Sequence, residues 1–473
     1  MAKRPRQRGN VSLPVLESTD GAKRPRSKRG VWRAAVLIGV HIVFAIHITQ
    51  WLIVGSTLSP VEPSESMQTL EFGAINTGFV FFVLAILSTF LFGRFLCGWG
   101  CHVVALQDLC GWMMKKLGTR PKPFRSRLLV WAPLAFGLYM FVWPTFKRTV
   151  LFPVMGAVGL ERPVWLRDVP ELRGFHAELI VTDFWATFPP WFVAIPFFLV
   201  IGFVAVYLLG AKGFCTYGCP YGGIFAPTDL ASPAKIKVND NCDASGHCTA
   251  VCTSNVRVHE EVRDFGMVVD PGCMKCLDCV SACPTDALSF GYAAPALIAK
   301  PRNKEAAARV AKKRKNPKRF DLSIREELAL AVVFVLVFLG YRGFLNHVPM
   351  LMAAGIAGIG AFLAWKLWSL VAKPNVRLQR LQLKADGRVR VSGVVLGLIA
   401  VGVLAGAAWG GVVNSLRWSA HLEHERIRVP LAVVLRPEYA AAPRHAMHAD
   451  RGTEAFERSR PLADGGVGWS LRP

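Results

Sequence analysis

The sequence predicts an α-helical integral membrane protein of about seven transmembrane helices, with a small cysteine-rich α+β domain inserted between two of them. The 473-residue chain combines a mean hydropathy of +0.35 with a formal net charge of +24. Membrane proteins with basic cytoplasmic loops often show this combination, and soluble proteins seldom do. The lysines and arginines flank long apolar segments, and this placement argues against nucleic acid as a partner.

Seven apolar runs are long enough to cross a bilayer, which takes about 20 residues. They lie near residues 34–55, 72–93, 128–146, 190–211, 327–345, 350–371 and 391–413. The loop 56–71 has no Lys or Arg, whereas the loop 94–127 is rich in them. By the positive-inside rule, this asymmetry predicts a multi-pass membrane protein with its N-terminus in the cytoplasm.

The domain order follows from these runs. It is a basic cytoplasmic tail (1–33), a four-span membrane domain (34–211), a cytoplasmic cysteine-rich domain (212–295), a basic linker (296–326), a three-span membrane region (327–413) and a polar extracytoplasmic tail (414–473). Residues 300–320 are expected to lie as a helix along the membrane surface. Residues 444–460 are expected to form one amphipathic helix.

Eleven of the twelve cysteines fall into four short motifs, and only Cys110 stands alone. In a secreted chain such pairs would indicate disulfides. Here the cysteines have tight spacing and lie on the side of the membrane that carries the basic loops. This placement favours thiolates that bind metal, because disulfides are rare in the reducing cytoplasm.

The strongest motif runs from Cys273 to Pro284 and contains Cys276, Cys279 and Cys283. Its C-x2-C-x2-C-x3-C-P spacing is that of bacterial iron–sulfur ferredoxins. There, three thiolates on one loop hold three irons of a cubane, and the fourth cysteine ligates the other cluster. A structural zinc site is the alternative, but zinc ligands usually come as separated C-x2-C pairs.

The partner motif keeps the register but is incomplete, because Ser245 stands where its second cysteine should be. By cross-ligation, the first [4Fe–4S] cluster takes Cys252, Cys273, Cys276 and Cys279, and the second takes Cys242, Cys248 and Cys283 with Ser245 at the fourth corner. The inserted domain is therefore expected to be bacterial ferredoxin-like, of the 2[4Fe–4S] type. Four readings of the second site stay open: ligation by the serine oxygen, a [3Fe–4S] cluster, an intervening water or His247, and a weak or absent cluster.

An internal repeat places two C-x3-C pairs at matching positions, each just after an apolar run and a basic residue. The pairs are Cys97 with Cys101 and Cys215 with Cys219. This predicts two related hairpins that bring both pairs to the cytoplasmic face. The spacing puts the cysteines of each pair about one helical turn apart, on one face if the segment is helical. The four thiols have three candidate uses: a shared redox or metal site, a redox dithiol, or structural thiols at the membrane edge.

These motifs, in this order, resemble those of the membrane polyferredoxins of the NapH, NosR and CcoG group. The resemblance covers roughly residues 30–295 and rests on the segment that starts at Phe92, on the Cys215 motif and on the ferredoxin motif. The chain departs from the family pattern at His102, which replaces a proline, and at Ser245. The resemblance implies electron transfer in an accessory role for nitrate reductase, nitrous-oxide reductase or cytochrome oxidase systems.

The leading hypothesis is a membrane-bound iron–sulfur protein that relays single electrons on the cytoplasmic face of the inner membrane. Membrane lipid and protein redox partners are expected, with quinone as a further candidate partner. An electron carrier is favoured over a substrate-converting enzyme. Two alternatives stay open: a metal-ion or cofactor reductase in oxidase assembly, and an iron–sulfur redox sensor.

Overall fold

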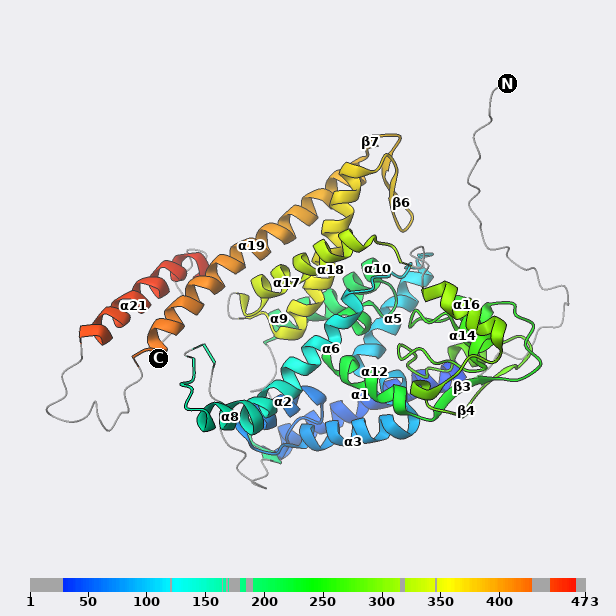
Figure 1. Ribbon diagram of the computed structural model, residues 1–473, viewed down its shortest axis with the longest axis horizontal. Coiled ribbons are helices and arrows are strands. Elements are labelled where there is room, and N and C mark those ends of the chain that lie inside the picture. The colour runs from blue at the N-terminus through cyan, green and yellow to red at the C-terminus, as the bar shows by residue number, and fades with distance from the viewer. Residues whose placement is uncertain are drawn as a thin grey trace.

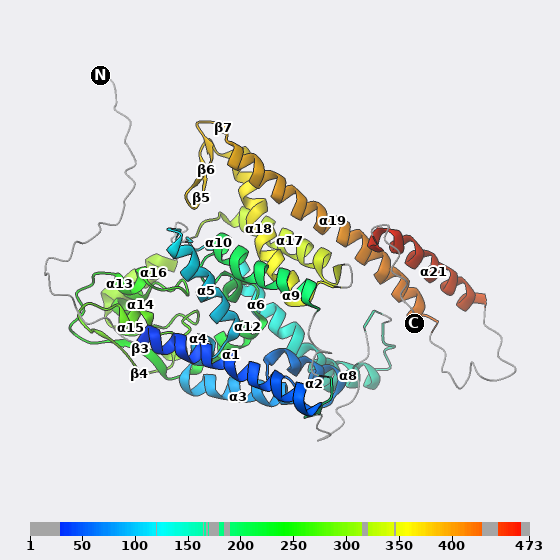
Figure 2. The same cartoon turned by 180° about the vertical axis from the view of Figure 1, so that it is seen from behind.

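A computed structural model describes residues 29–119, 121–163, 165–166, 169, 179–183, 190–314, 320–344, 347–427 and 443–464. Within these ranges the chain is mostly helical, with small antiparallel sheets (Figures 1 and 2). A small mixed domain around β3, β4 and α14 lies at one end of the helical body. An arm formed by α19 and α21 extends at the other end (Figure 1).

The first part of the body consists of helices joined by short turns. They are α1 (Arg29–Val54), α2 (Ser66–Phe72), α3 (Thr77–Phe92), α4 (Phe95–Trp99), α5 (His102–Lys116), α6 (Ala132–Gly137), α7 (Trp143–Phe146) and α8 (Phe152–Ala157). The last three join through π-helical turns at Leu138–Val142 and Lys147–Leu151, so they form one apolar stretch, Leu129–Ala157. Asn76 caps α3 by accepting a hydrogen bond from the Phe79 N–H at 2.8 Å.

The second hairpin leads to the inserted domain. Its helices are α9 (Trp191–Phe198), α10 (Ala205–Leu209), α11 (Gly213–Tyr217) and α12 (Pro220–Ala231). A π-helical segment, Leu199–Val204, joins α9 to α10 just after Pro196. Proline removes one helical hydrogen bond, and a wider turn accommodates that loss. The helix α12 packs along α6 and α3, so the segment just after the second cysteine pair lies against the membrane-type helices.

The inserted domain has an α+β arrangement. Its elements are β3 (Ala234–Val238), α13 (His247–Ala250), α14 (Val258–Phe265), α15 (Asp278–Ser281), β4 (Leu288–Tyr292) and α16 (Lys304–Arg314). The two strands pair antiparallel, with Ile236 opposite Phe290. Ile236, Val262 and Val268 are almost fully buried in the core of this domain, and cysteines 248, 252, 273, 279 and 283 pack against or within that core.

The C-terminal part begins with α17 (Ile324–Tyr341), whose start is fixed by a capping box between Ser323 and Glu326. It continues with α18 (Met350–Ala372), β5 (Val376–Leu378), β6 (Leu381–Ala385), β7 (Arg388–Val389), α19 (Val391–Glu425) and α21 (Pro443–Asp464). The basic segment 373–390, expected to be a loop, contains the three-stranded antiparallel meander β5–β6–β7.

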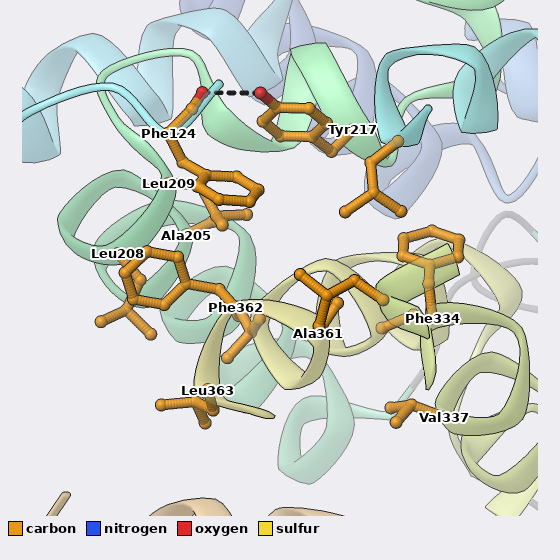
Figure 3. Close-up of a cluster of buried hydrophobic side chains, with 14 of the residues drawn as sticks. Phe124, Ala205, Leu208, Leu209, Tyr217, Phe334, Val337, Ala361, Phe362 and Leu363 are labelled. Carbon is orange, nitrogen blue, oxygen red and sulfur yellow. Dashed lines mark hydrogen bonds between the residues drawn. The ribbon is translucent and has the colours of Figure 1, made fainter. Parts of the chain in front are cut away.

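The largest buried core joins the two halves of the helical body. Figure 3 shows side chains of α10, α17 and α18 meeting around Phe362, with Phe124 and Tyr217 beside them. The Tyr217 hydroxyl donates to the carbonyl oxygen of Phe124 at 2.6 Å, which satisfies its polar end inside an apolar cluster. Since Tyr217 lies between the cysteines of the second pair, this core fixes that pair in place.

All seven predicted spans are helical in the described residues. Five helical segments are long and apolar enough to cross a membrane: Arg29–Val54, Leu129–Ala157, Trp191–Leu209, Met350–Ala372 and Val391–Glu425. Thr77–Phe92 is apolar but shorter, and Ile324–Tyr341 begins with the charged residues Arg325, Glu326 and Glu327. The described part of the chain is therefore mostly helical, and its five candidate spans indicate a multi-pass membrane protein.

Loops that the sequence assigns to the same side contact each other. On the basic side, the Lys122 N–H donates to Gln379 at 2.9 Å, and the Arg125 N–H donates to Asp321 at 2.8 Å. On the other side, β1 (Thr57–Leu58) pairs with β2 (Ile180–Val181). The inserted domain and the start of α1 lie together at the basic end, since α1 contacts α15.

Candidate functional site

The loop 273–279 has the curled backbone that a cubane-binding loop needs. Lys275 and Leu277 both adopt left-handed angles, with φ of +52° and +64°. Such angles are costly for residues with a side chain, so they indicate a loop whose shape serves a function. The backbone N–H of Asp278 donates to the sulfur of Cys276, which stabilises negative charge on that sulfur.

The loop 242–248 repeats this conformation. Ala244 and Gly246 have φ of +57° and +76°, at the same two positions relative to the first cysteine of the motif. A second match follows each motif, because Asn255 and Asp286 have φ of +66° and +50°, each three residues after the last cysteine. The two halves of the domain therefore share one backbone pattern, which the cysteine spacing predicted.

Within this pattern Ser245 occupies the position that Cys276 holds in the other loop. The Ser245 N–H donates to the Asp243 carboxylate at 3.1 Å, and the serine side chain is hydrogen-bonded to the same carboxylate. Residues 239–244 are all exposed. The fourth corner predicted for the second cluster is thus occupied by a neutral hydroxyl at the domain surface.

The four cysteines predicted for the first cluster, which we call the inner site, are brought together. The thiols of Cys252, Cys273 and Cys279 interact electrostatically with one another, and Cys276 interacts with Cys273. Burial raises the pKa of Cys252 to about 12, so a thiolate there needs a bound cation to balance its charge. Buried thiols on a curled loop fit the [4Fe–4S] binding that the motif predicts.

The residues predicted for the second cluster, which we call the outer site, are Cys242, Cys248 and Cys283 with Ser245. Cys242 and Cys248 interact electrostatically, and the sulfur of Cys283 accepts the Ala287 N–H at 3.3 Å. Cys242 is exposed, unlike the cysteines of the inner site. Of the predicted ligands, Cys242 and Cys248 therefore lie close together at the domain surface.

The inner loop lies directly on the first cysteine repeat. A Cβ atom placed on Gly98 would lie 2.2 Å from the carbonyl oxygen of Met274, so this contact requires glycine. The Trp99 indole N–H donates to the Lys275 carbonyl at 3.0 Å. From α1, the Arg33 Nε donates to the Gly98 carbonyl at 2.7 Å. The helix α4 therefore contacts the inner loop directly, and α1 supports α4 from behind.

A network of buried charges also holds the inner loop in place. Asp229 of α12 lies 2.8 Å from the Lys275 ammonium and 3.7 Å from that of Lys235. Its carboxylate also accepts the Arg94 N–H at 2.9 Å. Asp229 and both lysines are at most 1% exposed. Buried charges need such pairing, so the network ties the inner loop to the end of α3 and to α12.

The C-x3-C pairs lie at helix junctions rather than on one helix. Cys97 lies in α4 and Cys101 caps α5; Cys215 lies in α11 and Cys219 caps α12. The condition under which each pair would share one helical face is therefore not met, because α4 and α11 each end at a glycine before the second cysteine. The second cysteine of each pair instead lies at a helix N-terminus, where the helix dipole favours a thiolate.

The two pairs meet, as the repeat predicted. The Cys215 thiol interacts electrostatically with Cys219, Cys101 and Cys97, and Met274 of the inner loop packs in the same cluster. Burial raises the pKa of Cys101 to about 11 and that of Cys219 to about 12. Among the described residues, no three His, Cys, Asp or Glu side chains are close enough to hold a single metal ion. A cubane spaces its thiolates more widely, since each sulfur bonds a different iron.

We call Cys97, Cys101, Cys215 and Cys219 the quartet. Two buried cations, Arg94 and Lys212, lie beside it. The Arg94 guanidinium interacts with Cys97 and Cys215, and its Nε has no hydrogen-bond partner among the described residues. The Lys212 ammonium, at the matching position of the second repeat, is 1% exposed and pairs with Asp108. Positive charge of this kind stabilises thiolates or an anionic cluster.

A pocket of ≈ 470 Å³ lies beside Cys215 of the quartet. Its polar lining includes Arg94, Arg257 and Asp270, and Cys215 and Met274 border it as soft sulfur groups. Its apolar wall comes from α6, α12 and the preceding 3-10 turn Leu129–Trp131, where Trp131 is 63% exposed. The pocket therefore reaches from a thiol of the quartet to the edge of the apolar surface.

Comparison with known proteins agrees with this geometry. A family model described as a 4Fe–4S binding domain matches residues 77–120 and 192–238, the segments that contain the two C-x3-C pairs. The chain is 23% identical to the ferredoxin-type protein NapH of Haemophilus influenzae, over 44% of this chain and 66% of that protein. The chain is a distant homologue of ferredoxin-type 4Fe–4S proteins.

The chain is also similar to other proteins. The chain is 23% identical to the putative electron transport protein YccM of Escherichia coli, over 59% of this chain and 81% of that protein. It is 24% identical to an uncharacterized protein of Methanocaldococcus jannaschii, over 45% of this chain and 77% of that protein. No solved structure matches the chain.

Several residues that shape the ferredoxin-type sites were not predicted from the sequence. Arg33 and Asp229 lie outside the motifs, and no local pattern marks them. Met274 lies inside the ferredoxin motif, but its spacing points only to the cysteines and not to a contact with the quartet. The basic residue before each C-x3-C pair is a repeated signal, and it corresponds to the two buried cations Arg94 and Lys212.

Proposed function

We propose that this protein relays single electrons through iron–sulfur clusters at the cytoplasmic face of the bacterial inner membrane. The clusters supply one-electron redox chemistry when bound, and the residues around them set the potential through burial, hydrogen bonds and charge. The observation that carries the proposal is the contact between Gly98 and Met274, which places the inner site directly on the cysteine repeat.

The geometry supports an electron-transfer route through three redox centres. The exposed outer site receives or delivers electrons at the tip of the domain, where Cys242 faces solvent. The inner site follows, since Cys279 interacts with both Cys248 of the outer site and Cys273 of the inner one. The quartet comes last, beneath Met274. The family model described as a 4Fe–4S binding domain covers the quartet, which supports a cluster there.

The partners in this proposal lie at the two ends of the route. A protein redox partner docks at the exposed segment 239–244. At the other end, the pocket beside Cys215 opens next to Trp131, in position to admit a membrane-soluble carrier such as a quinone. The names of the relatives, ferredoxin-type protein NapH and putative electron transport protein YccM, support electron transfer. We propose that this transfer serves as an accessory to a respiratory or oxidase-assembly system, as the motif resemblance implies.

The test is a count of redox centres in anaerobically purified protein. Iron and sulfide analysis, with EPR-monitored potentiometry, is expected to show clusters in the wild type. The Cys97→Ser, Cys215→Ser double variant is expected to lose one centre while the inner site remains. The matched control is Cys110→Ala, which removes a buried thiol outside the motifs and leaves every centre in place. An unchanged iron content in the double variant would reduce the quartet to structural thiols.

A metal-ion reductase is the second candidate, and one observation favours it. Cys215 and the Met274 thioether border the same pocket, and soft sulfur donors suit monovalent copper. In that case the quartet is the site that binds the substrate metal ion rather than one of the redox centres of the electron-transfer route. Binding of one copper ion by cluster-loaded protein, lost in Met274→Leu, would support this candidate over the carrier role.

A further inference from the structure

The outer site differs from the inner site at one corner, where Ser245 stands in the place of Cys276. We propose that this corner holds an exchangeable iron, so that the outer site loses and regains one ferrous ion while the inner site keeps all four of its thiolate ligands. The inference rests on the proposed function and adds to it a ferrous-ion site. Occupancy of this site by iron determines whether the outer site can carry electrons.

The backbone places the serine at the corner and does not remove the corner. The left-handed angles of Ala244 and Gly246 match those of Lys275 and Leu277, so both loops curl in the same way. Three cysteines of the outer site remain in register. The loop is thus built to hold a cubane whose fourth iron lacks a thiolate.

The chemistry of Ser245 makes that iron the weakly held one. A serine oxygen is a harder donor than a thiolate, and iron–sulfur iron prefers soft sulfur. The Ser245 N–H donates to Asp243 at 3.1 Å, and the serine side chain is hydrogen-bonded to the same carboxylate. A hydroxyl hydrogen-bonded in this way keeps its proton, and a neutral hydroxyl is a poor ligand for iron.

The surroundings of the two corners differ in the same direction. Residues 239–244 beside Ser245 are exposed, and so is His247. The corresponding corner of the inner site is covered, because Arg33 lies 3.4 Å from Asp278 and Trp99 bonds to the Lys275 carbonyl. Ferrous ions and oxidants therefore reach the Ser245 corner directly from solvent.

The exchange balances with a one-electron oxidant, such as ferricyanide in the test or dioxygen in a cell. Cys242, Cys248 and Cys283 would hold a [3Fe–4S]⁺ core after a bound [4Fe–4S]²⁺ cluster passed one electron to the oxidant and released its corner iron as Fe²⁺, with the bonds from that iron to three sulfides broken. The return step takes one Fe²⁺ and one electron from a reductant. No cysteine bond changes, and Ser245 keeps its hydrogen bond to Asp243.

The experiment compares full-length wild type with Ser245→Cys and Ser245→Ala, each purified anaerobically in detergent. Each protein is treated with ferricyanide, then with dithionite and ferrous ion. Released iron is measured with a chromophoric chelator, and three-iron clusters are counted by EPR and Mössbauer spectroscopy. We expect the wild type to release one iron per protein and to take it back. Ser245→Cys is expected to release at least tenfold less, because its fourth iron has a thiolate. Ser245→Ala is expected to behave as the wild type.

The outcomes separate this inference from the proposed function. If Ser245→Cys releases as much iron as the wild type, the labile corner lies elsewhere and the inference is wrong. If the wild type keeps all its iron, the inference also fails, although a reducible protein would still support electron transfer. If Ser245→Ala releases iron much faster than the wild type, the serine oxygen is a ligand and the open-corner model is overturned. Absence of any iron or sulfide in the wild type would overturn both proposals.

Discussion

Lys275, which lies between two cysteines of the inner site, forms a 2.8 Å ion pair with Asp229 of α12. Both side chains are almost completely buried, and Lys235 lies 3.7 Å from the same carboxylate. A residue of the cluster loop is thus anchored in a helix that packs on the membrane-type body. The inner site and that body are therefore expected to be stable or unstable together.

Replacing Lys275 by Met should destabilise the docked domain. Removing one partner of a buried pair typically costs about 3–5 kcal/mol, because the remaining charge is left without its partner. Lys235 still faces Asp229, so we expect the lower end of that range. The measurement is thermal unfolding, followed by loss of the visible cluster absorbance. The matched control is Lys237→Met, on strand β3 two residues from Lys235. Equal stability of the two variants would contradict the expectation.

Gly98→Ala should displace the inner loop from the cysteine repeat. The added methyl group would lie 2.2 Å from the Met274 carbonyl oxygen, which no backbone contact tolerates. We expect weaker docking and slower electron exchange between the inner site and the quartet, measured by freeze-quench EPR. Gly111→Ala is the control, because no atom lies within 4 Å of its added methyl group and alanine favours the helix by about 1 kcal/mol. Wild-type exchange rates in Gly98→Ala would refute the contact's role.

Arg94→Gln should lower the reduction potential of a centre held by the quartet. The Arg94 guanidinium interacts with Cys97 and Cys215, and reduction adds negative charge beside it. Removing the cation disfavours the reduced state, so the potential moves to more negative values. EPR-monitored potentiometry measures this shift. Arg94→Lys keeps the charge and should recover most of the potential; a shift equal to that of the glutamine variant would point to lost packing instead.

Asp264→Asn should release α16 from α14. Burial by itself would raise the pKa of Asp264, but hydrogen bonds from Arg263, Lys313 and Arg309 outweigh it and bring that pKa well below its usual range. A lowered folded-state pKa stabilises the structure above the unfolded value of about 3.9, and this contribution is lost as the pH falls through the folded value. In the wild type, docking should therefore stay constant from neutral pH down to about pH 4.

Hydrogen exchange of the amides in α16 measures this docking. We expect fast exchange in Asp264→Asn at neutral pH and slow exchange in the wild type. Glu305→Gln is the control, because Glu305 is 83% exposed and its pair with Arg309, at 3.7 Å, is a surface pair of little energetic value. Protection in Asp264→Asn equal to that in the control would show that apolar contacts alone hold α16.

The sequence was most informative where spacing dictates backbone shape. The cysteine motifs predicted two similar loops, and matching left-handed angles at Ala244 and Lys275 appear in both. The apolar runs predicted helices at all seven positions, because length and composition suffice for that. They did not predict that α19 continues to Glu425, since a polar segment extends a helix when α21 packs against it.

Long-range contacts could not be predicted in the same way. The spacing of Cys97 and Cys101 suggested one helical turn, but a tertiary junction won over local periodicity, and Cys101 begins the next helix. A lone aspartate such as Asp229 looks like a surface residue in the sequence. Only the fold shows that it meets two lysines from separate segments. The helix at 444–460 was predicted from its amphipathic pattern, and α21 covers it.

The split origin of the quartet also dictates the order in which the protein can be made. One half of the quartet precedes the apolar stretches Leu129–Ala157 and Trp191–Leu209, and the other half follows them. During synthesis, the first pair has no partner until both stretches have entered the bilayer and α12 has left the ribosome. The inner loop, which packs over the quartet through Met274, is translated later still. Under the proposed function, a cluster at the quartet would therefore be inserted after both stretches have entered the membrane and before the inner loop closes over it.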